Sequence, residues 1–113
     1  MGHYSPAIVH NGLVYVSGQI AVDPSYGKLP SNKAVEVQTR QVLNNIVSIL
    51  EKHGSDKLKI IKTTVFTPDI IYWTIINEVY SNFFGDYKPA RTVVPTTSLH
   101  HNALVEIEAI AYI

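Results

Sequence analysis

The sequence contains no cysteine, which excludes disulfide bonds, thiolate catalysis and cysteine-ligated metal sites. Charged side chains are also scarce, at 16% of 113 residues, and nine basic residues balance nine acidic ones. This balance gives no electrostatic footprint for nucleic acid or an anionic membrane. No apolar run approaches the roughly 20 residues that span a bilayer. The first residues lack the basic and apolar regions of a signal peptide, so a cytoplasmic protein is expected.

The length of the chain predicts a single domain over residues 1–113, because a second independent core would not fit. Hydrophobic residues make up 46% of the sequence, which is typical of a folded protein. So few charges on a small protein indicate that part of its apolar surface is covered by a partner subunit.

Local patterns predict the element order ββαβαββ. Asn11-Gly12 lies between two apolar runs and indicates a hairpin, because both turn positions favour positive φ. Asp69 is a candidate cap for the second helix and Gly85 its stop. A polar loop is expected over 23–32. The expected elements are strands 7–10 and 13–17, helix 33–53, strand 58–66, helix 70–84, and strands 91–97 and 103–112.

This order indicates an α+β fold in which the helices cover one face of a sheet. The other face is rich in Val, Ile and Thr, and the chain has no element left to cover it. Since charges are few, we expect that face to pack against other subunits.

Arg91 is the first candidate for chemistry. It follows Pro89-Ala90 at a loop-to-strand junction, where its planar fork can bind a carboxylate through two hydrogen bonds. The alternative is an ion pair with Glu106 or Glu108, either within the chain or between subunits, and the spacing alone does not decide between the two roles. The other arginine, Arg40, lies in a helix and is expected to be solvated.

Further candidates lie on two strands. Strand alternation places Glu106 and Glu108 on the same side, either solvated or desolvated enough to carry a proton. Ser17 and Gly18 end the second strand, where glycine permits close backbone approach or forms a bulge.

The histidines and aromatic residues carry weaker signals. His100 and His101 are adjacent, so their side chains are expected to point apart and not to share a metal. Aromatic side chains on the second helix are expected in the core or at an interface rather than as a stacking platform. These are Tyr72, Trp73, Tyr80, Phe83 and Phe84.

Six motifs together resemble the RidA/YjgF family, and they extend along essentially the whole chain. They are Tyr15-Val16-Ser17-Gly18-Gln19-Ile20, Gln38-Thr39-Arg40-Gln41, Lys62-Thr63-Thr64-Val65-Phe66, Asn77-Glu78-Val79-Tyr80, Pro89-Ala90-Arg91 and Val105-Glu106-Ile107-Glu108-Ala109-Ile110-Ala111. The resemblance implies a chorismate-mutase-like fold, with a mixed sheet, two helices on one face, and a homotrimer around a central barrel. It also implies clefts between subunits.

The implied activity is hydrolysis of reactive 2-imino and 2-enamino acids, released by pyridoxal-phosphate dehydratases, to 2-oxo acids and ammonia. The family requires no metal and no organic cofactor for this reaction. By the same resemblance, Arg91 binds the substrate carboxylate with the backbone amide of Val93, and Glu106 holds the attacking water. Tyr4, Ser17 and Gly18 border the cleft, and Tyr4 is counted with Arg91 and Glu106 among the catalytic residues. Asn77 helps to enclose the ligand.

Three residues depart from the family pattern: Val93 replaces a common Cys, His3 replaces the Pro before Tyr4, and His100 replaces a Pro after Leu99. Val93 preserves a backbone contact but excludes a thiol role. Two other functions stay open: a non-catalytic module that binds small acids or acts as a chaperone, and an endoribonuclease or translation inhibitor. The neutral charge argues against RNA binding.

Overall fold

The structure, a computed structural model, describes residues 2–25 and 33–113. Most of the expected polar loop, 26–32, therefore lies outside the described residues. The elements are β1 (Ala7–His10), β2 (Leu13–Gln19), α1 (Val35–Lys52), η1 (Lys57–Lys59), β3 (Ile60–Thr67), η2 (Ile70–Tyr72), α2 (Trp73–Phe84), β4 (Ala90–Pro95), η3 (His100–Asn102) and β5 (Glu106–Tyr112). This order confirms the expected succession of strands and helices.

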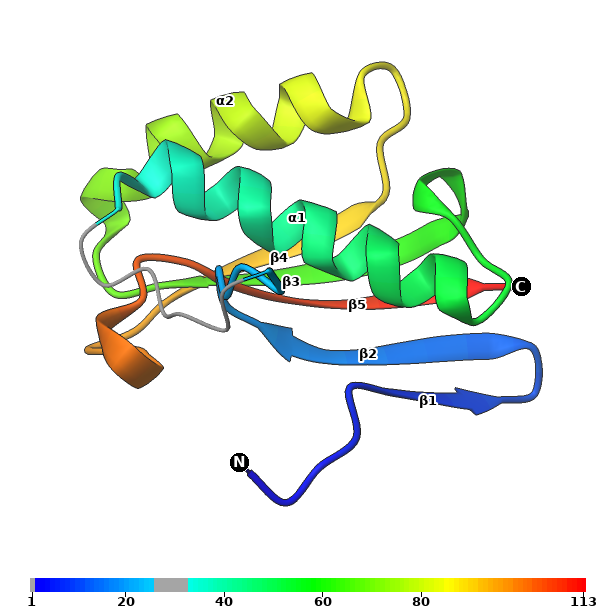
Figure 1. The fold of residues 1–113 in the computed structure, drawn as a ribbon. Helices are drawn as coiled ribbons and strands as arrows, with labels where there is room; N and C mark the ends of the chain where they lie inside the picture. Colours follow the sequence, from blue (N-terminus) through cyan, green and yellow to red (C-terminus); the bar gives the residue numbers. More distant parts are fainter. Residues whose placement is uncertain (1, 26–32) are drawn as a thin grey trace.

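The strands form a five-stranded mixed sheet in the order β1-β2-β5-β3-β4. Only β3 and β4 pair in parallel, and the other neighbours are antiparallel. Figure 1 shows α1 and α2 side by side over one face of this sheet. The expected α+β arrangement is therefore confirmed.

Buried aliphatic side chains of the sheet pack against both helices. Alternate residues of β5, namely Ile107, Ala109 and Ala111, lie in this core with Leu43 and Ile46 of α1. The intervening residues of β5 face the opposite side of the sheet, as strand alternation requires. None of the helices among the described residues is long and apolar enough to cross a bilayer.

Several element boundaries differ from those the sequence predicts. β2 continues to Gln19 through an irregularity in its pairing with β5 between Val16 and Gln19. Asp69 caps η2 rather than α2, with its carboxylate accepting from the Ile71 amide at 3.0 Å. The expected last strand, 103–112, begins only at Glu106, because Ala103–Val105 are in irregular structure.

Gln38 of α1 fixes the segment that leads into β5. Its side chain is fully buried, and its Oε1 accepts a hydrogen bond from the Leu104 amide at 2.9 Å. Its Nε2 donates to the Lys33 carbonyl, also at 2.9 Å. A polar residue on the inner face of the helix therefore satisfies a backbone group where the sheet offers no partner.

Replacing Gln38 with Leu is expected to lower the free energy of unfolding by about 1–3 kcal/mol, because the Leu104 amide loses its acceptor. Urea denaturation followed by circular dichroism measures this loss. Asn44→Leu, at an exposed position of the same helix, is the control and is expected to change stability by less than about 0.5 kcal/mol. Equal losses in both variants would contradict the assigned role of Gln38.

Candidate functional site

Arg91 lies near the start of β4, at the edge of the sheet. Parallel pairing places it opposite Thr63 of β3. Thr63 is buried, and its hydroxyl shares a hydrogen bond of 2.7 Å with the Tyr80 hydroxyl of α2. This side of the two strands therefore faces the helices. The Arg91 side chain consequently lies along α2 and not on the open face of the sheet.

Three residues of α2 hold the guanidinium of Arg91. Its Nη1 donates to Asn77 Oδ1 at 3.0 Å, and its Cζ lies 4.6 Å from the ring centroid of Trp73 and 4.7 Å from that of Tyr80. Trp73, Asn77 and Tyr80 are spaced i, i+4, i+7 and therefore share one side of the helix. Attraction between a cation and aromatic rings stabilises this position.

The expectation that the α2 aromatics belong to the core or an interface is therefore incomplete. Trp73 and Tyr80 pack against the core and also stack on Arg91. Burial raises the pKa of the Tyr80 hydroxyl above its usual range, opposed by the hydrogen bond to Thr63 and by the positive charge of Arg91. The helical spacing of Trp73, Asn77 and Tyr80 was the only sign in the sequence of these contacts with Arg91. The spacing does not indicate which strand the three residues face.

Arg91 and Asn77 line a cavity of about 380 Å³ between α2 and the segment that connects it to β4. We call it the Arg91 cavity. In the described part of the chain, the contacts of Arg91 are an amide oxygen and two rings, and not a carboxylate. One of five N–H donors is used by Asn77, so most of the fork is available to an acid.

A second hollow, of about 340 Å³, contains Glu106, and we call it the Glu106 cavity. Its lining includes Tyr4, Ser17, Gly18 and His100. The structure thus brings together four of the residues expected at the site, namely Tyr4, Ser17, Gly18 and Glu106. His100 joins them although the sequence offered no reason to place it there.

Gly18 and Ser17 shape this cavity in different ways. A Cβ at Gly18 would collide with Glu106 Oε2 and lie 3.1 Å from its carboxyl carbon. The absence of a side chain therefore lets the carboxylate lie against the β2 backbone. Ser17 Oγ donates to the Ser5 carbonyl at 2.6 Å and so holds the N-terminal segment that carries Tyr4.

The Glu106 carboxyl is half-buried, and this burial raises its pKa above the ordinary value of 4.5. The like charge of Glu108, two residues along the same strand, raises the pKa further, while His100 lowers it. A carboxyl group of this kind exchanges a proton closer to neutral pH than an ordinary glutamate does.

Arg91 and Glu106 do not meet within one chain. Arg91 pairs with Thr63, whereas Glu106 pairs with Phe66 of the same strand β3. Thr63 and Phe66 are three residues apart and lie on opposite faces of the sheet. The alternative of an ion pair between Arg91 and Glu106 or Glu108 of the same chain is therefore wrong.

Two further expectations concern His100 and His101. Their side chains do not point apart as expected: the ring centroids lie 3.9 Å from each other in an edge-to-face contact. His101 adopts positive φ, so this backbone is not the extended one in which neighbouring side chains point apart. No group of three or more metal-ligating side chains occurs among residues 2–25 and 33–113.

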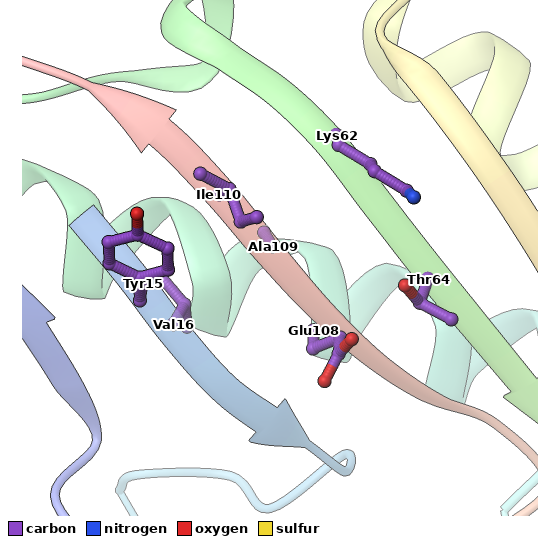
Figure 2. A pocket seen from close by; sticks show the side chains of 7 residues that line it. All are labelled: Tyr15, Val16, Lys62, Thr64, Glu108, Ala109 and Ile110. Atoms are coloured by element: carbon purple, nitrogen blue, oxygen red, sulfur yellow. The ribbon is translucent and has the colours of Figure 1, made fainter. Parts of the chain in front are cut away.

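The open face of the sheet carries a third hollow, of about 210 Å³. Figure 2 shows Tyr15, Lys62, Thr64 and Glu108, from three neighbouring strands, around it. Valine, isoleucine and tyrosine side chains lie beside charged ones on this face. Val93, two residues after Arg91 in β4, lies opposite the buried Val65 and packs against the core on the helix side of the sheet.

Comparison with known proteins gives the class of this fold and site. The family model described as Endoribonuclease L-PSP matches residues 1–113. A RutC family protein of Pyrococcus horikoshii is 43% identical over 112 residues, covering 99% of this chain and 88% of the relative. The human 2-iminobutanoate/2-iminopropanoate deaminase is 38% identical over 111 residues, covering 98% of this chain and 80% of the relative.

Comparison with solved structures leads to the same family. A Rid-family protein of Yersinia pestis has a TM-score of 0.95 at 45% identity, covering 100% of this chain and 90% of the other. TdcF of E. coli, crystallised with bound serine, has a TM-score of 0.93 at 36% identity with the same coverage. The chain therefore belongs to the Endoribonuclease L-PSP family, which is the RidA/YjgF family.

The raised pKa of Glu106 can be tested directly. Glu108→Gln is expected to lower it by removing a like charge, and His100→Gln to raise it. Carbon-13 NMR titration of the Glu106 carboxyl measures both shifts, with Glu51→Gln on the exposed side of α1 as the control.

The same shift affects stability. Because the folded protein binds this proton more tightly than the unfolded chain, Glu106 favours folding below pH 4.5, and this contribution is lost as the pH rises through the raised pKa. Titration of Glu106 at or below its ordinary value would contradict both statements.

Proposed function

We propose that the protein hydrolyses reactive 2-imino and 2-enamino acids to 2-oxo acids and ammonia. The observation that carries the proposal is the guanidinium of Arg91, which Trp73, Asn77 and Tyr80 hold at the edge of a cavity and which has no carboxylate partner among the described residues. Relatives named 2-iminobutanoate/2-iminopropanoate deaminase support the same reaction.

In this proposal Arg91 binds the substrate carboxylate through two N–H groups, and the Val93 backbone amide assists it. Asn77 keeps the guanidinium in place and borders the ligand. A charge-assisted contact of this kind contributes roughly 1.5–3 kcal/mol, which favours acids over neutral imines.

Glu106 handles the water. It holds a water molecule and accepts a proton as the oxygen adds to the electrophilic C=N carbon, which becomes a carbinolamine. The proton returns to the nitrogen, and the C–N bond breaks with release of ammonia while Glu106 accepts the proton of the hydroxyl group and the C=O bond forms. Ammonia then takes this proton from Glu106 and leaves as ammonium. Since an iminium carbon is already electrophilic, positioning and one proton carrier suffice, without metal or organic cofactor.

Two subunits complete the site in this proposal. Arg91 and Glu106 point to opposite faces of one sheet, so a cleft that uses both requires Arg91 of one protomer and Glu106 of the next. A homotrimer built on the open sheet face, around a central barrel, supplies three such clefts. Tyr4, Ser17 and Gly18 then border the substrate from the same protomer as Glu106.

The reaction is tested by coupling the protein to an amino-acid oxidase and trapping the remaining imine with semicarbazide. Wild type is expected to accelerate loss of the imine, and Arg91→Ala to lower kcat/KM by about 10- to 100-fold, because the carboxylate contact is lost. Arg40→Ala, the other arginine, on the exposed side of α1, is the control and is expected to retain activity.

Two results would contradict this function. Imine decay that is unaffected by wild type, with small acids still bound, would indicate a binding module. RNA cleavage that persists in Arg91→Ala would instead favour an endoribonuclease, the activity in the description of the family model.

The composite cleft predicts complementation between two variants of strongly reduced activity. Arg91→Ala and Glu106→Gln trimers, unfolded together and refolded as an equal mixture, are expected to recover roughly a quarter of wild-type activity, because about one cleft in four contains both native residues. Separately refolded variants mixed afterwards are the control. No recovery in co-refolded trimers would place both residues in the same protomer's site and contradict the arrangement.

A further inference from the structure

The Arg91 cavity contains a second cation that the proposed reaction does not use. Lys88 lines it together with Arg91 and Asn77, and Ser81 of α2 adds a hydroxyl group. Among the described residues that form its wall there is no Asp or Glu. Two positive charges therefore line one hollow whose described lining contains no acidic side chain, while Asp86, between the lining residues Gly85 and Tyr87, is exposed.

The two cations are held at a limited separation. Lys88 and Arg91 are three residues apart, so their Cα atoms lie at most about 10 Å from each other. Pro89, between them, fixes its own φ and stiffens this short segment. A small molecule with acidic groups at both ends can therefore reach both side chains.

The segment that carries Lys88 is anchored to the rest of the fold. The hydroxyl of its neighbour Tyr87 donates to the Ile60 carbonyl at the start of β3. Lys57 of η1 is held by other contacts: its Nζ donates to the Phe83 carbonyl at 3.0 Å and lies over the Phe83 ring. The position of Lys88 at the edge of the cavity is thus set by the backbone around it.

We propose that Lys88 binds the distal carboxylate of a 2-imino dicarboxylic acid whose first carboxylate is bound by Arg91. The volume of the cavity, about 380 Å³, is within the range of small-molecule sites, about 300–1,000 Å³. This inference rests on the proposed function and names its substrate class. A site with two cations and no acid favours a dianion over a monoanion in both binding and encounter.

The test compares two imines in the semicarbazide assay, one made by oxidation of aspartate and one by oxidation of alanine. We expect wild type to have the higher kcat/KM for the dicarboxylate. Because Lys88 is exposed, Lys88→Gln should lower the dicarboxylate-to-monocarboxylate ratio by about two- to fivefold. Lys52→Gln, an exposed lysine at the end of α1, should leave the ratio unchanged.

A binding measurement separates this inference from the reaction itself. Trp73 is the only tryptophan and contacts Arg91, so its fluorescence reports ligand at the guanidinium. Oxaloacetate and pyruvate, the two product acids, serve as probes. Oxaloacetate should bind about two- to fivefold more tightly to wild type, and Lys88→Gln and added salt should remove the difference.

The outcomes are distinguishable. Turnover of both imines at similar rates, with the ratio unchanged in Lys88→Gln, overturns the role of Lys88 and leaves the deaminase intact. A preference for oxaloacetate that depends on Lys88, without turnover of either imine, supports the dicarboxylate site and overturns the deaminase.

Discussion

The parallel pairing of β3 with β4 is the constraint on which the Arg91 site depends. Two parallel neighbours need a crossover, and α2 is that crossover, so the helix must pack over the strands that it connects. Trp73, Asn77 and Tyr80 then lie above the start of β4. The same connection ends in Lys88 and Pro89, so the cation pair and the aromatic rings are both consequences of one β-α-β unit.

A different part of the sheet builds the Glu106 cavity. The irregular pairing of β2 with β5 brings Gly18 against the Glu106 carboxylate, and Ser17 ties down the segment that bears Tyr4. Gln38 supports this region from α1 by binding the Leu104 amide just before β5. The chain turns through His101 and Asn102, both in positive φ, shortly before this contact.

The two cavities have complementary chemical properties. One presents positive charge and aromatic surface, and the other presents a carboxyl group whose pKa is raised by burial and by Glu108. Because strand alternation directs them to opposite faces of the sheet, neither is a complete site for acid binding and proton transfer. This division is the physical reason for proposing that neighbouring subunits share a cleft.

The sequence by itself determined the order of the elements, the hairpin at Asn11-Gly12, the end of α2 at Gly85 and the family, because these depend on local pattern and on motifs in order. It could also place Glu106 and Glu108 on one side of a strand. Which face Arg91 occupies, its contacts with Trp73 and Tyr80, and the proximity of His100 to Glu106 were decided only by the tertiary structure. Such contacts join residues far apart in the chain, and strand register and the crossover helix, rather than local spacing, determine them.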